Sequence, residues 1–594
     1  MAALLAARRE TAPALPEIDT TTALGAKDAL IARLEKNATV ARDAPKRVDV
    51  RTALMKALKA YKRADYKAAV LRALEATRLD PKAAQAYHTL ALALEGLGDL
   101  HKALLMYERA MQLDPKDPEV YLNLGLVAWK LRMLEGAEKF FRVYVAMNAE
   151  SHLGYNNLGG VLRDQARFDD AIEILRGAIH RFPDKAELWN TLGTVAMEQG
   201  SIAEAQIFYQ EALRLDPRFA RTYHNIAYAL SHTGEFEDAA RYYDKALKLM
   251  GEHPDAVEAH HGRALSLLGL GKLEEGFAAW EVRHDPRFRA SMLYAVKAPR
   301  WQGEPLDGKR LLVMGEQSLG DELLFSNVLP DLIRGVGPDG KLLVSVDSRL
   351  VPLFQRSFPE AEVGSYDDKR HNGKDVRCVP WLAEQAPVDY FTTCGSTLRF
   401  LRTDIASFPI GAPHLKPEPS RVAFWRKRLE ALGPGPYVGV SWRSLVTTGP
   451  RVKHFSPLDE WAPVLKTEHV RFINLQYDDC AADLERARTR FGVDIHDFTD
   501  LDLKHAQDDN AALCRALDLV VSAPTAAGAL AGAVGTEVWL LTAGKVWPAL
   551  GTDRFPWFVK SRVLSPKRYA DWPELMTRLA RELEAFVQNR GSTP

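Results

Sequence analysis

Three short stretches of this sequence place polar and charged side chains directly after apolar runs. The first runs from Gly315 to Asp321 and follows the apolar run Leu311–Met314. Apolar residues at helical spacing come next, so the segment predicts a buried strand that turns into a helix. Such a turn presents backbone N–H groups at the carboxyl edge of a sheet, where ligands bind. Asp321 is therefore either a helix cap or a general base that takes a proton from a hydroxyl group.

The second stretch is the loop of residues 443–455, which follows the apolar run Tyr437–Trp442. It combines cations, hydroxyl groups and a glycine at the predicted carboxyl end of a strand, a combination that suits phosphate oxygens. The alternative is a solvated basic loop. His454 in this loop, and Glu322 beside Asp321, are further candidates for a base. The candidate phosphate ligands are Arg443, Thr447, Thr448 and Lys453.

The third stretch, from Ser522 to Gly532, crowds small residues into a predicted strand-to-helix turn. A phosphate could lie on the helix N-terminus there, with Ser522 or Thr525 donating hydrogen bonds. Equally, a helix of small residues can simply pack tightly against a sheet. Two such turns on neighbouring strand ends favour a nucleotide phosphate. Because the cations supply the charge and the cleft-facing loops hold no Asp-x-Asp pair, we expect no metal and no other cofactor.

The totals limit the classes of protein to which the chain can belong. At 594 residues it should contain several domains, and its 78 basic and 78 acidic residues give no global sign of nucleic-acid binding. Its four cysteines have no metal-ligand spacing, which indicates reduced thiols. No apolar run approaches the length of a membrane helix, and the N-terminal apolar segment is too short for a secretion signal. We expect a cytoplasmic protein without membrane insertion.

A repeat of 34 residues organises the chain from Val50 onward. Each unit carries a large residue at its fourth position, a small residue at its eighth and an alanine at its twentieth. The period is that of tetratricopeptide repeats, and it predicts stacked helix pairs that form a superhelix with a concave groove. A seventh, degenerate unit starts near Val257. The other units start at Val50, Ala84, Pro118, His152, Ala186 and Ala220.

The sixth position of the first helix should face the groove, and it reads Asn in three units: Asn123, Asn157 and Asn225. An amide both donates and accepts hydrogen bonds, so a ladder of Asn can hold an extended peptide by its backbone. The alternative is that Asn is merely tolerated on a solvated face. We favour the ladder, and we therefore expect the repeats to bind a protein partner in the groove.

The remainder of the chain alternates short apolar runs with helical patterns, which predicts two successive doubly wound lobes joined by the proline-rich segment 409–419. The predicted fold class is an α-solenoid followed by an α/β double-Rossmann module. We expect a mobile tail over residues 1–49, repeats over 50–290, a first lobe over 291–419 and a second lobe over 420–594. No flexible linker separates repeats and lobes, so we expect them to be docked. Residues 371–377 are expected to form a loop, and the last helix to pack on the first lobe.

The sequence resembles bacterial tetratricopeptide proteins with a C-terminal glycosyltransferase module of the GT-B fold, similar in outline to O-GlcNAc transferases. The matching stretches include residues 315–321, 472–476, 517–522, 530–535 and 538–541. The resemblance implies that Asp321 is the acceptor-side base. It further implies that Thr447, Thr448 and Lys453 lie near the donor phosphates, and it adds Gln476 to the donor-binding candidates.

Two positions depart from that family. Its acidic residue and histidine that touch the sugar donor appear here as Pro524 and Ala529, so either the donor differs or activity is lost. Within the group the chain looks most like flagellin-modifying glycosyltransferases, whose donor is a CMP-activated nonulosonic acid such as pseudaminic acid. The resemblance thus implies transfer of a sugar from a nucleotide to Ser or Thr of a bound protein, flagellin. A non-catalytic adaptor with a degenerate α/β module is the alternative.

Overall fold

The computed structural model describes residues 45–371, 374–409, 411–445 and 449–591, so the tail predicted for residues 1–49 lies almost entirely outside it. The described residues form two compact units, a first unit of residues 45–222 and a second unit that begins at residue 223. The boundary falls within one helix, α13 (Ala220–Thr233), and not at the end of the repeats. The last two repeats therefore belong to the same unit as the α/β module.

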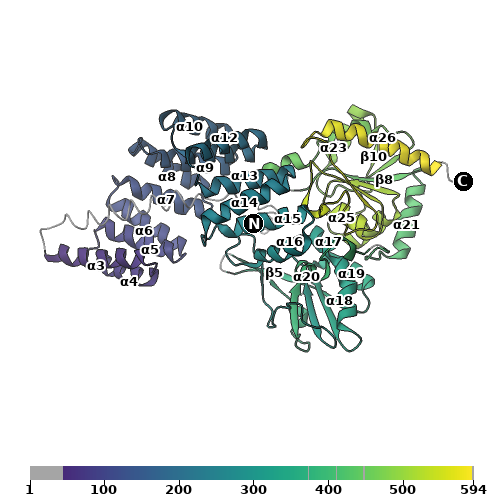
Figure 1. The fold of residues 1–594 in the computed structure, drawn as a ribbon, viewed down its shortest axis with the longest axis horizontal. Coiled ribbons are helices and arrows are strands. Elements are labelled where there is room, and N and C mark those ends of the chain that lie inside the picture. Colours follow the sequence, from purple (N-terminus) through teal and green to yellow (C-terminus); the bar gives the residue numbers. More distant parts are fainter. Residues whose placement is uncertain (1–44, 372–373, 410, 446–448, 592–594) are drawn as a thin grey trace. The chain divides into compact units, whose positions relative to one another are not determined.

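The predicted repeats are present as seven helix pairs (Figure 1). Five of the seven first helices begin at the predicted residue, from Ala84 to Ala220. The first unit contains α3 (Pro45–Lys62), α4 (Tyr66–Leu79), α5 (Ala84–Gly96), α6 (Leu100–Leu113), α7 (Pro118–Lys130), α8 (Leu134–Met147), α9 (His152–Asp164), α10 (Phe168–Arg181), α11 (Ala186–Glu198) and α12 (Ile202–Leu215). After α13 come α14 (Phe236–Met250), α15 (Ala256–Gly269) and α16 (Leu273–Trp280).

The repeated small residues have a direct packing role. A Cβ atom at Gly125, the eighth position of its repeat, would lie 2.5 Å from the ring of Phe141 on the second helix of the pair. Gly193 meets Tyr209 in the same way, at 2.5 Å. The alanines at the twentieth position, from Ala69 to Ala239, are fully buried. A small residue on one helix thus makes room for a large one on the other, which allows the two helices to cross closely.

The first lobe contains a four-stranded parallel sheet in the order β4-β3-β2-β7. Because β3 and β4 lie on one side of β2 and β7 on the other, the winding reverses beside β2, at the point where ligands bind in such sheets. The strands are β2 (Arg310–Met314), β3 (Lys341–Val346), β4 (Glu362–Ser365) and β7 (Tyr390–Thr393). The helices are α17 (Leu319–Phe325), α18 (Leu329–Val336), α19 (Val351–Ser357) and α20 (Cys394–Leu401).

A second, smaller sheet corrects one expectation. Residues 371–377, predicted as a loop, contribute to an antiparallel pair formed by β5 (Asp367–His371) and β6 (Lys374–Cys378). β6 also pairs in parallel with β1 (Leu293–Tyr294). Every residue of β5 is exposed, so the strand shows none of the apolar alternation by which a strand is recognised in a sequence.

The second lobe contains a six-stranded sheet in the order β10-β9-β8-β11-β12-β13, parallel throughout. Its winding reverses between β8 and β11, the two strands that precede the second and third predicted ligand stretches. The strands are β8 (Tyr437–Ser441), β9 (Arg471–Asn474), β10 (Ile495–His496), β11 (Leu519–Ser522), β12 (Val538–Leu541) and β13 (Ser561–Leu564). The helices are α21 (Pro419–Glu430), α22 (Ala462–Leu465), α23 (Ala481–Arg486), α24 (Gln507–Ala516), α25 (Ala526–Ala533) and α26 (Trp572–Gly591).

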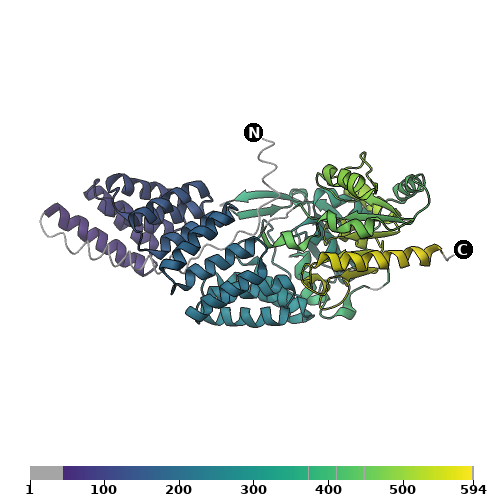
Figure 2. The same cartoon turned by 90° about the horizontal axis from the view of Figure 1, so that it is seen from above.

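The last helix, α26, packs on the second lobe, whereas the sequence analysis placed it on the first. Leu575, Leu579 and Leu583 are fully buried in a core shared with Trp461 and with Val440 of β8. Figure 2 shows this helix, in yellow, lying along the second lobe.

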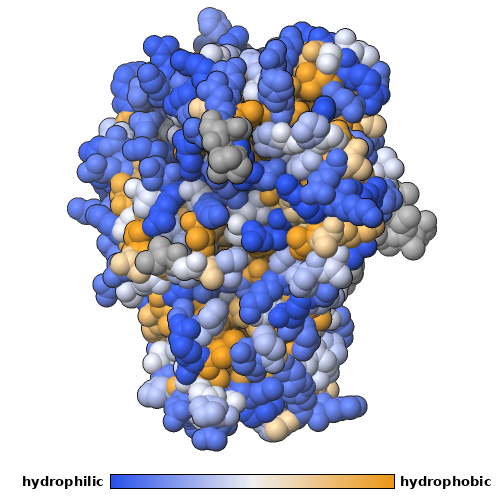
Figure 3. Space-filling model, turned by 90° about the vertical axis from the view of Figure 1, so that its right-hand side faces the viewer, coloured by the Kyte–Doolittle hydropathy of each residue, from blue (hydrophilic) through white to orange (hydrophobic). Residues whose placement is uncertain are grey.

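The predicted docking of repeats and lobes is confirmed for the last two repeats. Trp280 at the end of α16 contacts Phe325 of the first lobe and Trp547 of the second, with ring centroids 5.7 and 6.0 Å apart. Phe277 contacts Trp557 in the same core. On the face shown in Figure 3, apolar residues lie in small groups among hydrophilic ones, as is usual for a surface in contact with water.

Candidate functional site

The loop that follows β2 is anchored by hydrogen bonds to the buried carboxylate of Glu316. The carboxylate of Glu316 is 2% exposed and accepts two hydrogen bonds of 3.0 Å from the guanidinium of Arg283, which follows the last repeat. It also accepts a hydrogen bond from the N–H of Gly395. Gly315 leaves space for the carboxylate of Glu322, which would collide with a Cβ atom. The next residue, Gln317, is exposed and has a positive φ of 61°.

Asp321 combines the two roles considered for it. It forms a capping box at the start of α17, where its Oδ2 accepts hydrogen bonds from the N–H and the hydroxyl of Ser318, at 3.1 and 2.6 Å. Its Oδ1 accepts no hydrogen bond from the residues that the structure describes. Burial raises the pKa of the Asp321 carboxyl, against the hydrogen bonds from Ser318 and the positive charge of Arg451. Asp321 can therefore cap the helix through Oδ2 and still accept a proton from an acceptor hydroxyl through Oδ1.

The N-termini of α17 and α25 meet across the two lobes. A Cβ atom at Gly320 would lie 3.7 Å from the Cα atom of Ala526, the first residue of α25. Both helices follow the reversal point of their own sheet. The structure therefore brings the first and the third predicted stretches into contact, with Asp321 next to the contact.

The turn before α25 has the features expected of an anion site, although its hydroxyl groups are partly engaged. Thr525 is the N-cap residue and makes no side-chain capping bond. The hydroxyl of Ser522 is fully buried, donates to the carbonyl of Ala523 at 2.6 Å and lies 3.4 Å from the hydroxyl of Thr525. Thr525 is thus the better placed of the two to contact a ligand. Pro524, which replaces the family's acidic residue, is exposed.

The second stretch adjoins the third, because Ser441 of β8 pairs with Ser522 of β11. Arg443, however, is already engaged by carboxylates. Its guanidinium donates to Asp478 at 3.0 Å and to Asp483, and it also donates to the carbonyl of Asp479 at 3.2 Å. Two carboxylates compensate its charge, so Arg443 anchors the loop to residues 478–483 and offers a phosphate little net attraction.

Gln476 also has a structural role that the resemblance did not suggest. Its side chain is 2% exposed, and its Oε1 accepts hydrogen bonds from the N–H groups of Trp442 and Arg443 at 3.0 and 3.1 Å. Its Nε2 donates to the carbonyl of Arg443 and to Asp478. The amide therefore joins the ends of β8 and β9, and no part of it is left to contact a sugar donor.

The cations that remain in this loop are Arg451 and Lys453. Both are exposed, and neither forms an ion pair with a described residue. Arg451 lies close enough to Asp321 to affect its pKa, so the loop reaches the first lobe. The list of candidates from the sequence omitted Arg451, although its position two residues before Lys453 was a sufficient signal. Thr447 and Thr448 lie outside the described residues.

Of the two further candidates for a base, Glu322 is buried and His454 is half-buried. The carboxylate of Glu322 accepts hydrogen bonds from the hydroxyl of Tyr366 at 2.7 Å and from the N–H of Asp347 at 2.9 Å, and burial raises its pKa to about 7. Burial lowers the pKa of His454 to about 4. Glu322 is engaged by its hydrogen-bond partners, and the pKa of His454 is too low for an efficient base near pH 7. Asp321 therefore remains the best placed base.

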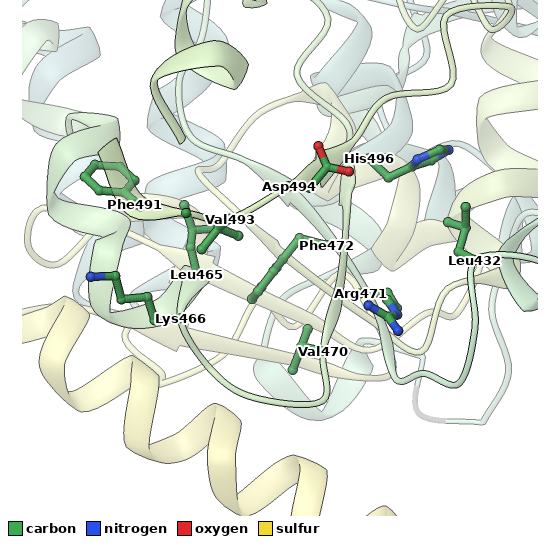
Figure 4. A pocket seen from close by; sticks show the side chains of 11 residues that line it. Leu432, Leu465, Lys466, Val470, Arg471, Phe472, Phe491, Val493, Asp494 and His496 are labelled. Carbon is green, nitrogen blue, oxygen red and sulfur yellow. The ribbon is translucent and has the colours of Figure 1, made fainter. Parts of the chain in front are cut away.

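One cavity of the second lobe, about 470 Å³ in volume, lies away from this arrangement (Figure 4). It is lined by residues at the amino ends of β9 and β10, among them Val470, Arg471 and Asp494. Ligands of parallel sheets bind at the carboxyl ends of the strands. This cavity is therefore not the predicted donor site.

The predicted Asn ladder is only partly available to a peptide. The amide of Asn123 is 3% exposed, donates to the carbonyl of Glu119 at 2.9 Å and lies 3.1 Å from Nε2 of His88. Asn157 is 7% exposed and makes no hydrogen bond to a described residue. Asn225 is half-buried and belongs to the second unit. Peptide binding by these residues stays a prediction, best supported for Asn157.

Two observations concern only the residues that the structure describes. Within them, no three His, Cys, Asp or Glu side chains are grouped in a way that suits a metal ion. No helix in the same residues has both the length and the apolar character needed to cross a membrane.

Comparisons with known proteins support the repeat assignment directly. Models of the tetratricopeptide repeat match residues 157–218 and 220–253, and a TPR repeat model matches residues 96–131. The chain thus contains tetratricopeptide repeats, and a C-terminal α/β region follows them. It is similar to protein FlbA of Caulobacter vibrioides, with 41% identity over 337 residues, or 57% of this chain and 56% of FlbA. The chain therefore matches little more than half the length of that relative.

Similar solved structures cover only part of the chain. YrrB, described as a TPR protein with an unusual peptide-binding site, is 23% identical and covers 32% of this chain and 96% of its own, with a TM-score of 0.23. TTC0263, a thermophilic TPR protein of Thermus thermophilus, is 25% identical and covers 31% and 100%, with a TM-score of 0.28. Yeast Tom70 is 19% identical and covers 43% and 54%, with a TM-score of 0.33.

Proposed function

We propose that this chain is a protein O-glycosyltransferase that transfers a sugar from a nucleotide donor to a Ser or Thr of a protein bound by its repeats. The observation that carries the proposal is the meeting of α17 and α25 at Gly320 and Ala526. It brings the carboxyl edges of two doubly wound sheets together, with a base candidate on one side and an uncapped helix N-terminus on the other. Group transfer from a nucleotide needs these two elements on opposite sides of the reacting bond.

In the proposed reaction, Oδ1 of Asp321 takes the proton of the acceptor hydroxyl as its oxygen attacks the anomeric carbon of the sugar. The bond between that carbon and the phosphate oxygen breaks, and its electron pair leaves with the nucleotide. The N-terminus of α25, with Thr525, and the cations Arg451 and Lys453 stabilise the charge that develops on the phosphate. The raised pKa of Asp321 makes its carboxylate a stronger base than an exposed aspartate.

The donor in this proposal is a CMP-activated nonulosonic acid, and the acceptor is flagellin, held in the repeat groove. The exposed Pro524 and the buried Ala529 stand where the related enzymes contact their own sugar, so a different sugar would require a different pocket. The proposal does not use a metal, because the cations and the helix N-terminus carry that role. It places the reaction in the cytoplasm.

A second candidate function is a non-catalytic adaptor. The observation in its favour is that two predicted donor contacts, Arg443 and Gln476, are fully engaged by partners within the second lobe. In that case the repeats bind a partner, and the α/β region has a structural role.

Intact-mass analysis separates the two functions. The full chain is incubated with purified, unmodified flagellin and a panel of nucleotide sugars that includes a CMP-nonulosonic acid. A discrete mass increase on flagellin supports the transferase, and no increase with any donor supports the adaptor. Asp321→Asn should lower the rate at least about 100-fold, since general base catalysis contributes on that order. Asp339→Asn, an exposed acidic residue of the same lobe, is the matched control and should leave the rate unchanged.

A further inference from the structure

The turns of the sixth and seventh repeats contact the second lobe through their backbones. Gly234 in the turn between α13 and α14 has a φ of +84°, and a Cβ atom there would lie 2.8 Å from the backbone N of Lys545. Gly271 occupies the corresponding turn of the seventh repeat, and its Cβ atom would lie 3.1 Å from the carbonyl oxygen of Leu550. Lys545 and Leu550 both follow β12. The segment that follows this strand thus contacts two repeat turns.

The sixth repeat also contacts the basic loop of residues 443–455, which precedes β9. His232, near the end of α13, lies with its ring centroid 5.1 Å from that of His454. Its Nδ1 lies 3.1 Å from the carbonyl oxygen of Tyr228 in the preceding turn of the helix. On its other side, His454 packs against Tyr569, with the ring centroids 6.4 Å apart. The ring of His454, near the end of the loop, therefore contacts the rings of both His232 and Tyr569.

A further contact holds the neighbouring residue of the loop. The carbonyl of Lys453 accepts a hydrogen bond of 3.3 Å from Nε1 of Trp572 at the start of α26. The backbone of Lys453 and the ring of His454 are thus fixed, while the side chains of Arg451 and Lys453 remain exposed. A loop held at its end in this way keeps its cations at a defined place, because a fixed backbone loses less conformational freedom when a ligand binds.

We infer that His232 is a positioning residue: the sixth repeat holds the basic loop through the ring of His454, and with it the exposed cations Arg451 and Lys453. The repeat array then supplies part of the nucleotide site in addition to the acceptor groove. This inference rests on the proposed function for what the loop binds. The contact between His232 and the loop does not depend on that function.

The test compares three full-length variants with the wild type. His232→Ala removes the ring, His232→Phe keeps an aromatic ring of similar size, and His260→Ala removes an exposed histidine of the neighbouring helix α15. Hydrogen exchange is followed by mass spectrometry for peptides that cover residues 451–456 and, as a reference, α16. Binding of CMP and of UDP is measured by calorimetry on the same samples.

We expect His232→Ala to raise exchange in residues 451–456 about tenfold or more, since freed loops open readily. Exchange in α16 should stay unchanged, and the dissociation constant of the bound nucleotide should rise by about the same factor. His232→Phe and His260→Ala should behave as the wild type.

Unchanged exchange in residues 451–456 of His232→Ala would overturn the inference. Equal acceleration in α16 would also overturn it, because the residue would then stabilise the whole unit and not the loop. If the wild type binds neither nucleotide and transfers no sugar, the proposed function fails. The local exchange of the variants then still decides whether the repeat positions the loop.

Discussion

The same helix pair is used in two ways along this chain, and the turn inside the pair shows the difference. In all seven repeats one turn residue has a positive φ, from 57° at Ala64 to 84° at Gly234. In the first unit Ala64, Arg132 and Ala166 occupy that position in three repeats and glycine in the other two, whereas both repeats of the second unit have glycine. At Gly98 of the second repeat, no described residue other than its two chain neighbours has an atom within 4 Å of the added Cβ. At Gly234 the backbone of Lys545 fills that space.

Glycine therefore has one reason to occur in the early turns and two in the late ones. A left-handed φ favours glycine at every repeat but tolerates other residues at a modest energetic cost. Contact with another backbone excludes any side chain. Some repeats pack on another domain and others contact only neighbouring repeats. A turn glycine that makes room for a neighbouring backbone marks the first kind.

We expect the largest difference in stability between the two units at the junction of the last repeat and the first lobe, where an ion pair is buried. Arg283→Ala removes the guanidinium that pairs with Glu316 and Glu281 and that is 3% exposed. Leaving buried carboxylates without their partner should lower the unfolding free energy of the second unit by about 3–5 kcal/mol. Ten of the twelve tryptophans lie in residues 223–594, so urea titration followed by tryptophan fluorescence reports mainly on this unit.

The control for this prediction is an ion pair on the surface of the fifth repeat. Arg214 pairs with Glu211 one turn away and is exposed. Arg214→Ala should change stability by at most about 0.5 kcal/mol, since exposed pairs contribute little. Equal effects of the two variants would show that Arg283 does not carry the junction.

The second prediction compares the two turns directly. Gly98→Ala and Gly234→Ala impose the same strain, because their φ values are +82° and +84°. That strain should lower the unfolding free energy of each variant by about 1–2 kcal/mol. Gly234→Ala should lose about 1–3 kcal/mol more, because Lys545 must move.

Thermal unfolding of both variants, followed by circular dichroism and by tryptophan fluorescence, measures the two losses. The additional loss should be visible in the fluorescence signal of the second unit. If the two variants lose the same free energy, the backbone contact at Gly234 contributes nothing, and the distinction between early and late turns fails.

The sequence predicted the repeat helices and the alternation of strands and helices, but it missed several strands, among them β4, β5 and β13, and it did not reveal the long-range partners. The helix starts and most strands of both parallel sheets follow from local periodicity, and the reversal points then bring the predicted ligand stretches together. Arg443 was assigned to a phosphate because its partners Asp478 and Asp483 lie 35 and 40 residues further along the chain. No local pattern encodes such a pairing, and the same holds for His232 and His454.

The third prediction concerns pH. Burial lowers the pKa of His232 to about 3 and those of His261, His414 and His454 to about 4, and all four lie in the second unit. In the unfolded chain a histidine titrates near pH 6.5, so between about pH 4 and 6.5 the unfolded state binds more protons. Stability contributed by these neutral rings is therefore present above pH 6.5 and is lost as the pH falls. Glu322, whose pKa is raised, acts in the opposite direction over about pH 4.5 to 7.

Each of the four histidines should thus lower the unfolding free energy by about 2 kcal/mol when the pH falls from 7 to 5. Urea titrations at several pH values, again followed by tryptophan fluorescence, measure the slope. His232→Phe should reduce that slope by up to about 1.4 kcal/mol per pH unit. A slope identical to that of the wild type would mean that His232 titrates normally in the folded state.

The fourth and smallest effect concerns the contacts between repeats in the first unit. The carbonyl oxygen of the Asn156 side chain accepts a hydrogen bond of 2.7 Å from the hydroxyl of Thr191, which lies one repeat further, and both residues are buried. Asn156→Ala leaves that hydroxyl without a partner and should cost about 1–2 kcal/mol. The neighbouring variant, Asn157→Ala, removes an amide that bonds to no described residue. It should cost less, with both losses measured by urea titration and circular dichroism.

The pair of variants also separates two roles that a ladder of Asn can have. If Asn156 joins the repeats and Asn157 faces an acceptor, Asn156→Ala lowers stability with little effect on peptide affinity, and Asn157→Ala does the reverse. Fluorescence anisotropy with labelled peptides from the acceptor measures the affinity. Should Asn157→Ala bind the peptides as tightly as the wild type, the ladder joins repeats only. The first five repeats would then have to hold a partner through other side chains.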